Sequence, residues 1–127
     1  MNADRKHYDN ISERIIGCAF IVSNALGSGF LEKVYENALA HELNKAGLGV
    51  TQQIAIKVEY DGVNVGSYVA DLVVENAILV EVKAVRALDA MHDAQCLNYL
   101  KATGLKVCLL LNFAKPRLEF KRRVNGF

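Results

Sequence analysis

Two carboxylates and a lysine stand out because they interrupt runs of β-branched and aliphatic residues. Asp71 lies within VADLVV, and Glu81 and Lys83 lie within ILVEVKAV. An unpaired charge in such a strand carries a large desolvation cost, so a partner must compensate it. Two facing carboxylates also repel each other unless they share a proton or a cation. These residue types therefore indicate a metal site with a lysine beside it.

The chemistry of such a site follows from its ligands. Carboxylate oxygens favour a hard divalent cation, for which Mg²⁺ is our candidate, and the cation can acidify an attacking water. Lys83 can orient that water or stabilise negative charge that develops on a phosphate. A surface cluster of Asp71, Lys83 and Glu81 without any function explains the same spacing. Spacing alone supports the two interpretations equally.

The register of a hairpin decides whether the two carboxylates meet. Glu81 and Lys83 are two residues apart and project from one face of their strand, whereas Val82 projects from the other. If the hairpin is centred on Asn76, Asp71 lies directly across from Glu81, with Cβ atoms about 4.5–5.5 Å apart. A two-residue turn would move Asp71 to the opposite face. The site therefore requires an odd-numbered loop or a bulge.

Hydrophobic periodicity predicts the elements that must position these residues. Apolar residues recur at helical spacing over residues 11–26, 30–47 and about 90–104. Alternating or uniformly apolar runs predict strands over residues 50–60, 63–75, 77–85 and 105–113, and residues 118–124 can add an edge strand. The order α-α-β-β-β-α-β-β predicts an α/β sandwich in which helices flank a central mixed sheet of four or five strands.

Length and composition fit one intracellular domain. The chain has 127 residues, of which 52% are hydrophobic, so we expect residues 1–127 to form a single domain with its own core. We find neither a secretory signal nor the roughly 18 apolar residues of a membrane span. We therefore expect a soluble, cytoplasmic protein with no membrane partner. Cys18, Cys96 and Cys108 are widely spaced, and we expect reduced, buried thiols.

The charge balance restricts how nucleic acid can bind. Fifteen basic and fourteen acidic side chains leave a formal charge of +1, which is little for a protein that holds a polyanion. Any such contact must therefore be local. The densest basic stretch comprises Lys115, Arg117, Lys121, Arg122 and Arg123. A solvated tail is the simpler explanation of this stretch, and a phosphate-contacting edge is the alternative.

Several linked motifs resemble a known family. Residues 29–35, GFLEKVY, match the GxxExxY signature of a family of small bacterial proteins. Later segments look like its further blocks in the right order, at residues 68–75, 80–85, 92–95, 103–105 and 111–113. The resemblance covers about residues 15–124. That family looks like a branch of the PD-(D/E)XK nuclease superfamily, which implies a restriction-endonuclease-like sandwich.

The resemblance also implies roles for the charged residues. Asp71, Glu81 and the backbone carbonyl of Val82 would bind Mg²⁺ or Mn²⁺. Lys83 would be the catalytic lysine, and Glu32 would add a further acidic group from the preceding helix, both to the catalytic set and to the metal ligands. Val82 and Glu32 enter the set through the resemblance alone.

Two neighbouring helices contribute residues of secondary rank. Glu36 lies one turn after Glu32 on the same helix face, so it can take the role of Glu32. Gln95 and Tyr99 match a QxxxY pattern that resembles RecB-type members of the superfamily. Gln95 would belong to the catalytic set and orient Lys83 or a phosphate. Tyr99 is explained equally well by packing in an amphipathic helix.

The residues and the resemblance together favour a metal-dependent nuclease that hydrolyses DNA phosphodiester bonds. RNA stays open as a substrate. The alternative is a catalytically silent nuclease-fold domain that binds nucleic acid or a partner protein within a larger assembly, which the low net charge permits. The intact set of Asp71, Glu81 and Lys83 favours the enzyme. A homodimer would offer a duplex more surface, but no feature of the sequence requires one.

Overall fold

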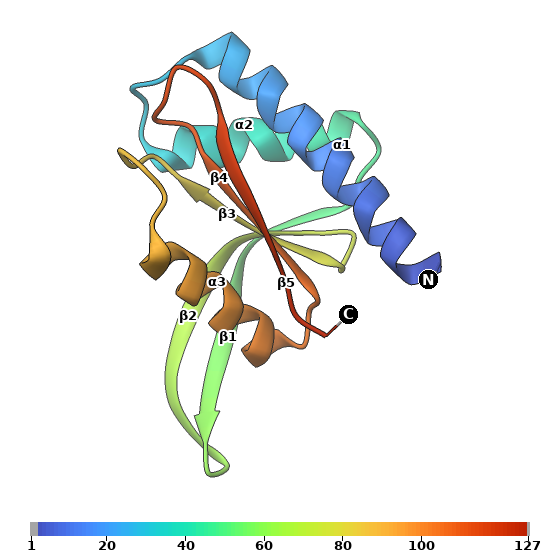
Figure 1. Ribbon diagram of the computed structural model, residues 1–127, viewed down its shortest axis with the longest axis vertical. Coiled ribbons are helices and arrows are strands. Elements are labelled where there is room, and N and C mark those ends of the chain that lie inside the picture. The colour runs from blue at the N-terminus through green and yellow to red at the C-terminus, as the bar shows by residue number, and fades with distance from the viewer. Residues whose placement is uncertain (1–2, 127) are drawn as a thin grey trace.

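The computed structural model describes residues 3–126, and within them three helices and five strands follow the predicted order (Figure 1). The helices are α1 (Ala3–Leu26), α2 (Glu32–Lys45) and α3 (Ala90–Thr103). The strands are β1 (Val50–Tyr60), β2 (Val63–Val74), β3 (Ile78–Lys83), β4 (Val107–Asn112) and β5 (Glu119–Val124). The predicted order α-α-β-β-β-α-β-β is therefore confirmed.

The first helix is longer than the apolar pattern indicates. α1 begins well before residue 11, because the polar residues that precede Ile11 add helical turns without an apolar stripe. None of the helices in residues 3–126, α1 included, is long and apolar enough to cross a membrane.

The strands form one mixed sheet in the order β1-β2-β3-β4-β5. β3 and β4 run parallel, and every other neighbouring pair is antiparallel. α3 provides the crossover that the parallel pair needs, as predicted. β4 is buried at every position because helices cover both of its faces. The buried strand that its uniformly apolar run predicts is therefore confirmed.

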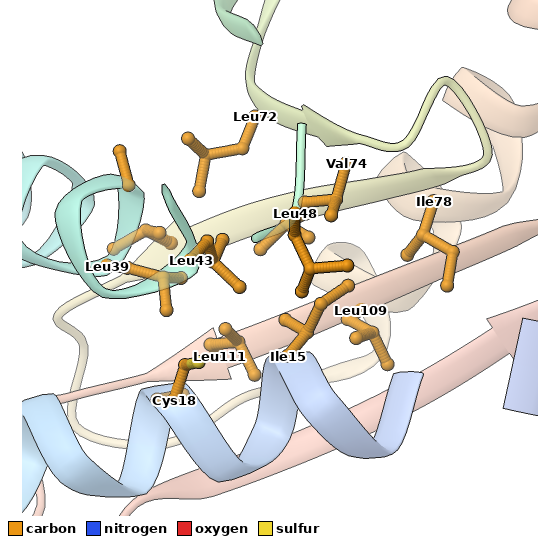
Figure 2. Packing of buried hydrophobic residues seen from close by; sticks show 14 of the residues in the cluster. Ile15, Cys18, Leu39, Leu43, Leu48, Leu72, Val74, Ile78, Leu109 and Leu111 are labelled. Atoms are coloured by element: carbon orange, nitrogen blue, oxygen red, sulfur yellow. The ribbon is translucent and has the colours of Figure 1, made fainter. Parts of the chain in front are cut away.

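The core divides into two apolar clusters, one on each face of the sheet. Leu109 and Leu111 of β4 face α1 and α2, where Leu39 and Leu43 meet them (Figure 2). Leu110, between them in sequence, faces α3 instead. Burial of each such side chain contributes about 1.5–3 kcal/mol. The alternation holds the two layers of helices against one sheet.

The cysteines differ in part from the expectation of three reduced thiols. Cys96 of α3 and Cys108 of β4 form a disulfide across the layer between helix and sheet. Their separation of 12 residues spans the end of α3 and the turn into β4, so linear spacing does not reveal that they meet. Cys18 is free and buried, as expected, and burial raises the pKa of its thiol.

The basic stretch near the C-terminus is partly used inside the fold. Arg122 of β5 pairs with Asp9 of α1 at 2.7 Å, and Arg123 pairs with Asp93 of α3 at 2.9 Å. Lys121 lies 3.9 Å from the same Asp93 carboxylate. These three side chains therefore attach the edge strand to helices, which is neither of the two roles expected from the sequence.

Candidate active site

A three-residue loop determines the register of the β2–β3 hairpin. Residues 75–77 join the two strands, and the first two of them have positive φ values of 55° and 52°. Leu72 pairs with Val80, so the next position in this register places Asp71 opposite Glu81. The loop has the odd number of residues that the predicted geometry requires. The structure therefore brings the two carboxylates together.

The side chains of Asp71 and Glu81 continue the hairpin where its backbone pairing ends. Beyond the pair of Leu72 and Val80, the Asp71 N–H donates to Glu81 Oε2 at 2.8 Å. In return, the Val82 N–H donates to Asp71 Oδ2 at 2.8 Å. Each carboxylate thus accepts from the neighbouring strand. This exchange fixes both groups between β2 and β3.

Burial raises the pKa of both carboxyl groups. Burial first, and the charge of Asp71 second, raise the pKa of Glu81 to about 7, and this side chain is only 3% exposed. Burial is also the largest cause that raises the pKa of Asp71, although the Val82 N–H opposes it. The Lys83 ammonium favours the charged form of both groups. A bound cation would stabilise the same two charges further.

Lys83 and Gln95 connect the hairpin to α3. Lys83 is the last residue of β3 and shares the face of Glu81, and its Nζ donates to Gln95 Oε1 at 3.4 Å. Tyr99 lies one turn after Gln95 and is 5% exposed. Burial, followed by the charge of Glu81, raises the pKa of the Tyr99 hydroxyl to about 12. The predicted helix partners therefore lie at the site.

Glu32 approaches from the opposite side of the hairpin end. It is the first residue of α2, and its Oε2 accepts a hydrogen bond from the Ala84 N–H at 3.2 Å. Its charge also contributes to the raised pKa of Asp71 and of Glu81, so it lies near both. The structure thus brings the predicted acidic residue of the helix to the end of β3.

Glu36 is more deeply buried than Glu32 and has a separate set of partners. Its carboxylate is held by Gln52 at 2.8 Å, by Gln53 at 2.9 and 3.0 Å, and by Lys33 at 3.3 Å. Its side chain is 4% exposed. Glu36 therefore joins α2 to β1, and its charge also raises the pKa of Asp71. Glu32 joins α2 to Ala84, the residue that follows β3.

Sequence reasoning missed a change of face in the first two strands. Ala70 packs on the α3 side of the sheet and Leu72 on the α1–α2 side, although strict alternation would place them on one face. Asp71 lies between them. Gln53, which the β1–β2 register places opposite Asp71, has a φ of 57°. The only available signal was Gln53 itself, a polar residue at mid-strand whose partner Glu36 is remote in sequence.

The donor set suits a hard cation, and it is small. No three His, Cys, Asp or Glu side chains gather closely enough to hold a metal ion among residues 3–126, so Glu32 does not complete a three-carboxylate cluster there. Asp71 Oδ1 and Glu81 Oε1 accept no hydrogen bond from the described chain. These two oxygens are free to bind a cation whose other ligands are backbone carbonyls or water. The residues therefore fit Mg²⁺ or Mn²⁺ in ligand type.

The fold and the charged set together define a class of protein. It is an α/β sandwich whose central hairpin carries an Asp…Glu-x-Lys set, with helices on both sides. A family model described as the PD-(D/E)XK nuclease superfamily matches residues 9–123. The chain therefore belongs to the PD-(D/E)XK nuclease superfamily, and the predicted superfamily and restriction-endonuclease-like fold are confirmed. The narrower GxxExxY branch stays a prediction.

Solved structures share this fold at low sequence identity. An alkaline exonuclease (LHK-Exo) from Laribacter hongkongensis superposes with a TM-score of 0.56 at 15% identity, over 98% of this chain and 71% of that one. The crystal structure of SSO0001 gives a TM-score of 0.57 at 17% identity, over 98% and 63% of the two chains. This chain thus spans about two thirds of each neighbour. A comparison with curated proteins gave no match.

Proposed function

We propose that the protein is a nuclease that hydrolyses phosphodiester bonds of DNA with the help of Mg²⁺ or Mn²⁺. The observation that carries the proposal is the exchange of hydrogen bonds between the carboxylates of Asp71 and Glu81 and the facing strands, with Lys83 beside them. Burying two like charges together is costly, and a bound cation would offset this cost for both carboxylates at once. Superfamily membership supports the same activity.

The residues divide the work by their chemistry. Asp71 and Glu81 would hold the cation, with the Val82 carbonyl as a further oxygen ligand that the family motif implies. Glu32, which the motif also implies, does not complete a cluster with them among the described residues. When bound, the cation lowers the pKa of a coordinated water and stabilises charge on phosphate oxygens. Lys83 donates a hydrogen bond to Gln95 at 3.4 Å, and its ammonium lies near both carboxylates. It can orient the water or donate to a phosphate oxygen as negative charge develops.

A second candidate function is binding of nucleic acid, or of a partner protein, without cleavage. One observation favours it: the described residues gather two carboxylates at the site and not a three-residue cluster of metal-binding side chains. A domain that only binds has, however, no need to bury two acidic groups side by side. The nuclease is therefore the better supported of the two.

A digestion panel tests the nuclease directly. Purified protein is incubated with single-stranded, duplex and branched DNA, and with RNA, in Mg²⁺, Mn²⁺ or EDTA. We expect cleavage of DNA that needs the cation and falls by roughly 100-fold or more in Asp71→Asn and in Lys83→Ala. Glu13→Gln, an exposed carboxylate of α1, is the matched control and retains activity. Cleavage that persists in both site variants would remove the assignment, and no cleavage of any substrate would favour the binding function.

A further inference from the structure

A groove runs between the β1–β2 hairpin and α3 and ends beside the candidate active site. Figure 1 shows the hairpin extending past α3. Two adjoining hollows of about 490 and 260 Å³ make up the groove, and both are lined by Val58, Tyr68 and Asn98. Lys57 and Lys101 line the outer hollow. Volumes of this size are typical of sites for small ligands. The groove can therefore hold one or two nucleotides and not a duplex.

Tyr68 forms an aromatic platform inside the groove. Its side chain is 50% exposed, and its ring lies 5.5 Å from the ring of Tyr99 at an angle of 49°. Because Tyr99 is buried and supports it, the Tyr68 ring is held in place while part of its surface is open. Exposed aromatic rings of this kind stack with nucleobases without regard to sequence.

The outer part of the groove has cations that the fold does not use. Lys57 and Lys101 take part in none of the ion pairs of the described chain, unlike Lys121 and Arg123 of β5. Glu59 shares the lining, so one positive charge is left in excess. Lysines without an ion-pair partner along a groove are suited to bind phosphate groups. They would attract nucleic acid locally, although the net charge of the protein is low.

The inner end of the groove reaches the catalytic set. Gln95 and Tyr99 line the inner hollow. Gln95 accepts a hydrogen bond from Lys83, and the Tyr99 hydroxyl is influenced by the charge of Glu81. A strand that lies in the groove therefore leads from Lys57 and Lys101, past the Tyr68 ring, to Gln95, which contacts Lys83.

We propose that this groove binds one DNA strand in single-stranded form and leads it to the active site. A base stacks on Tyr68, and phosphates further from the site contact Lys57 and Lys101. The inference rests on the proposed nuclease function, because it names the form of the substrate that the same site receives. It predicts a preference for single-stranded DNA or for frayed ends over blunt duplex.

Binding measured without cleavage tests the groove. Fluorescence anisotropy with a labelled oligothymidylate in EDTA reports affinity independently of catalysis. We expect Tyr68→Ala to weaken binding about tenfold and Tyr68→Phe to retain it, because the phenyl ring still stacks. Tyr60→Ala, at the 74% exposed hairpin tip outside the groove, is the matched control and leaves affinity unchanged. Equal affinities for Tyr68→Ala and the wild type would overturn the proposal.

The salt dependence of the same measurement tests the phosphate contacts. Lys57→Ala and Lys101→Ala should each weaken binding and lower the slope of log affinity against log salt by about 0.7. Lys45→Ala, on α2 outside the groove, should leave the slope unchanged. Glu59→Gln should tighten binding, since it removes the opposing charge. Unchanged slopes in both lysine variants, or an equally tight blunt duplex, would contradict the groove.

The two proposals fail in different ways. If the groove variants reduce binding of the strand while no substrate is cleaved, the proposed groove is supported and the proposed nuclease activity is rejected. The opposite result is cleavage of DNA in Mg²⁺ by the wild type, with an unchanged rate on single strands in Tyr68→Ala, Lys57→Ala and Lys101→Ala. It would support the nuclease and reject the groove. Thermal unfolding of each variant confirms that the protein still folds.

Discussion

The two faces of the sheet are built in different ways. Under α1 and α2, a large apolar cluster joins both helices to β2, β3 and β4 (Figure 2). Under α3, a smaller cluster shares its face with Glu81 and Lys83 and leaves hollows that residues of the helix line. A single helix of the described chain covers this second face, so charged groups and a groove can exist there. The larger apolar cluster therefore lies on one face of the sheet, and the side chains of Glu81 and Lys83 lie on the other.

Truncation of one leucine on each face of β4 tests this division. Leu111→Ala opens a cavity in the large cluster, and we expect a loss of about 4 kcal/mol in the free energy of unfolding. Leu110→Ala, the neighbouring residue on the α3 face, should cost about 2–3 kcal/mol, because the smaller cluster has room to relax. Chemical denaturation with urea measures both. Equal losses would show that the two faces are packed alike.

Much of the fold and part of the site follow from local patterns. The element order follows from periodicity, and the placement of Glu81 and Lys83 on one face follows from their spacing. The facing position of Asp71 followed only under the condition of an odd loop, which the structure meets at residues 75–77. The element order and the hairpin register depend on residues close together in the chain. Side-chain alternation and turn geometry therefore restrict which faces these residues can occupy.

Other features depend on residues that are distant in sequence. Gln53 has a positive φ and its side chain reaches Glu36. In the run VTQQIAIKVEY only the polar side chain of Gln53 marks that change of face, and its partner lies in another element. The C-terminal basic residues looked like a tail or a phosphate edge, yet Arg122 pairs with Asp9 at the other end of the chain. A single sequence without tertiary distances does not reveal such partners.

The disulfide adds to this comparison, because it lies on the face with the smaller apolar cluster. Cys96→Ala removes the link between α3 and β4. We expect the free energy of unfolding to fall by about 2–3 kcal/mol, because the unfolded chain is no longer restricted by a short closed loop. Dithiothreitol should lower the melting temperature of the wild type to that of Cys96→Ala and leave the variant unchanged. Cys18→Ala is the control, since that free thiol lies on the other face and the variant keeps its response to the reductant.

Neutralising Glu81 should stabilise the protein while it abolishes cleavage. Burial and the charge of Asp71 raise the pKa of Glu81 to about 7 from its ordinary value of 4.5, so the folded state binds this proton more tightly than the unfolded chain does. Its contribution to stability is full below about pH 4.5 and is lost as the pH rises through about 7. Glu81→Gln at pH 8 in EDTA should therefore gain about 2 kcal/mol in unfolding free energy.

The pH profile of unfolding separates this explanation from a general effect of charge. The wild type should lose stability between about pH 4.5 and 7, whereas Glu81→Gln should show a flatter profile over the same range. Mg²⁺ should restore stability to the wild type at pH 8 and not to the variant, because binding to the folded state alone stabilises it. Glu13→Gln controls for the loss of one exposed carboxylate. A wild-type profile that rises over this range would contradict the assignment.

We expect the smallest change in stability where α3 contacts β5, because an ordinary ion pair joins the two elements there. The Arg123 guanidinium hydrogen-bonds Asp93 and lowers the pKa of that carboxyl group, opposite in direction to the shift at Glu81. The pair therefore contributes stability at neutral pH and loses it as the pH falls below the ordinary range of an aspartate. Arg123→Gln should cost about 0.5 kcal/mol at pH 7, as for partly exposed pairs, and nothing once Asp93 is protonated. Arg117→Gln, in the β4–β5 loop, is the exposed control. Opposite pH dependences at Glu81 and Asp93 would show that a hydrogen-bonded partner stabilises the charged form of Asp93, whereas burial destabilises the charged form of Glu81.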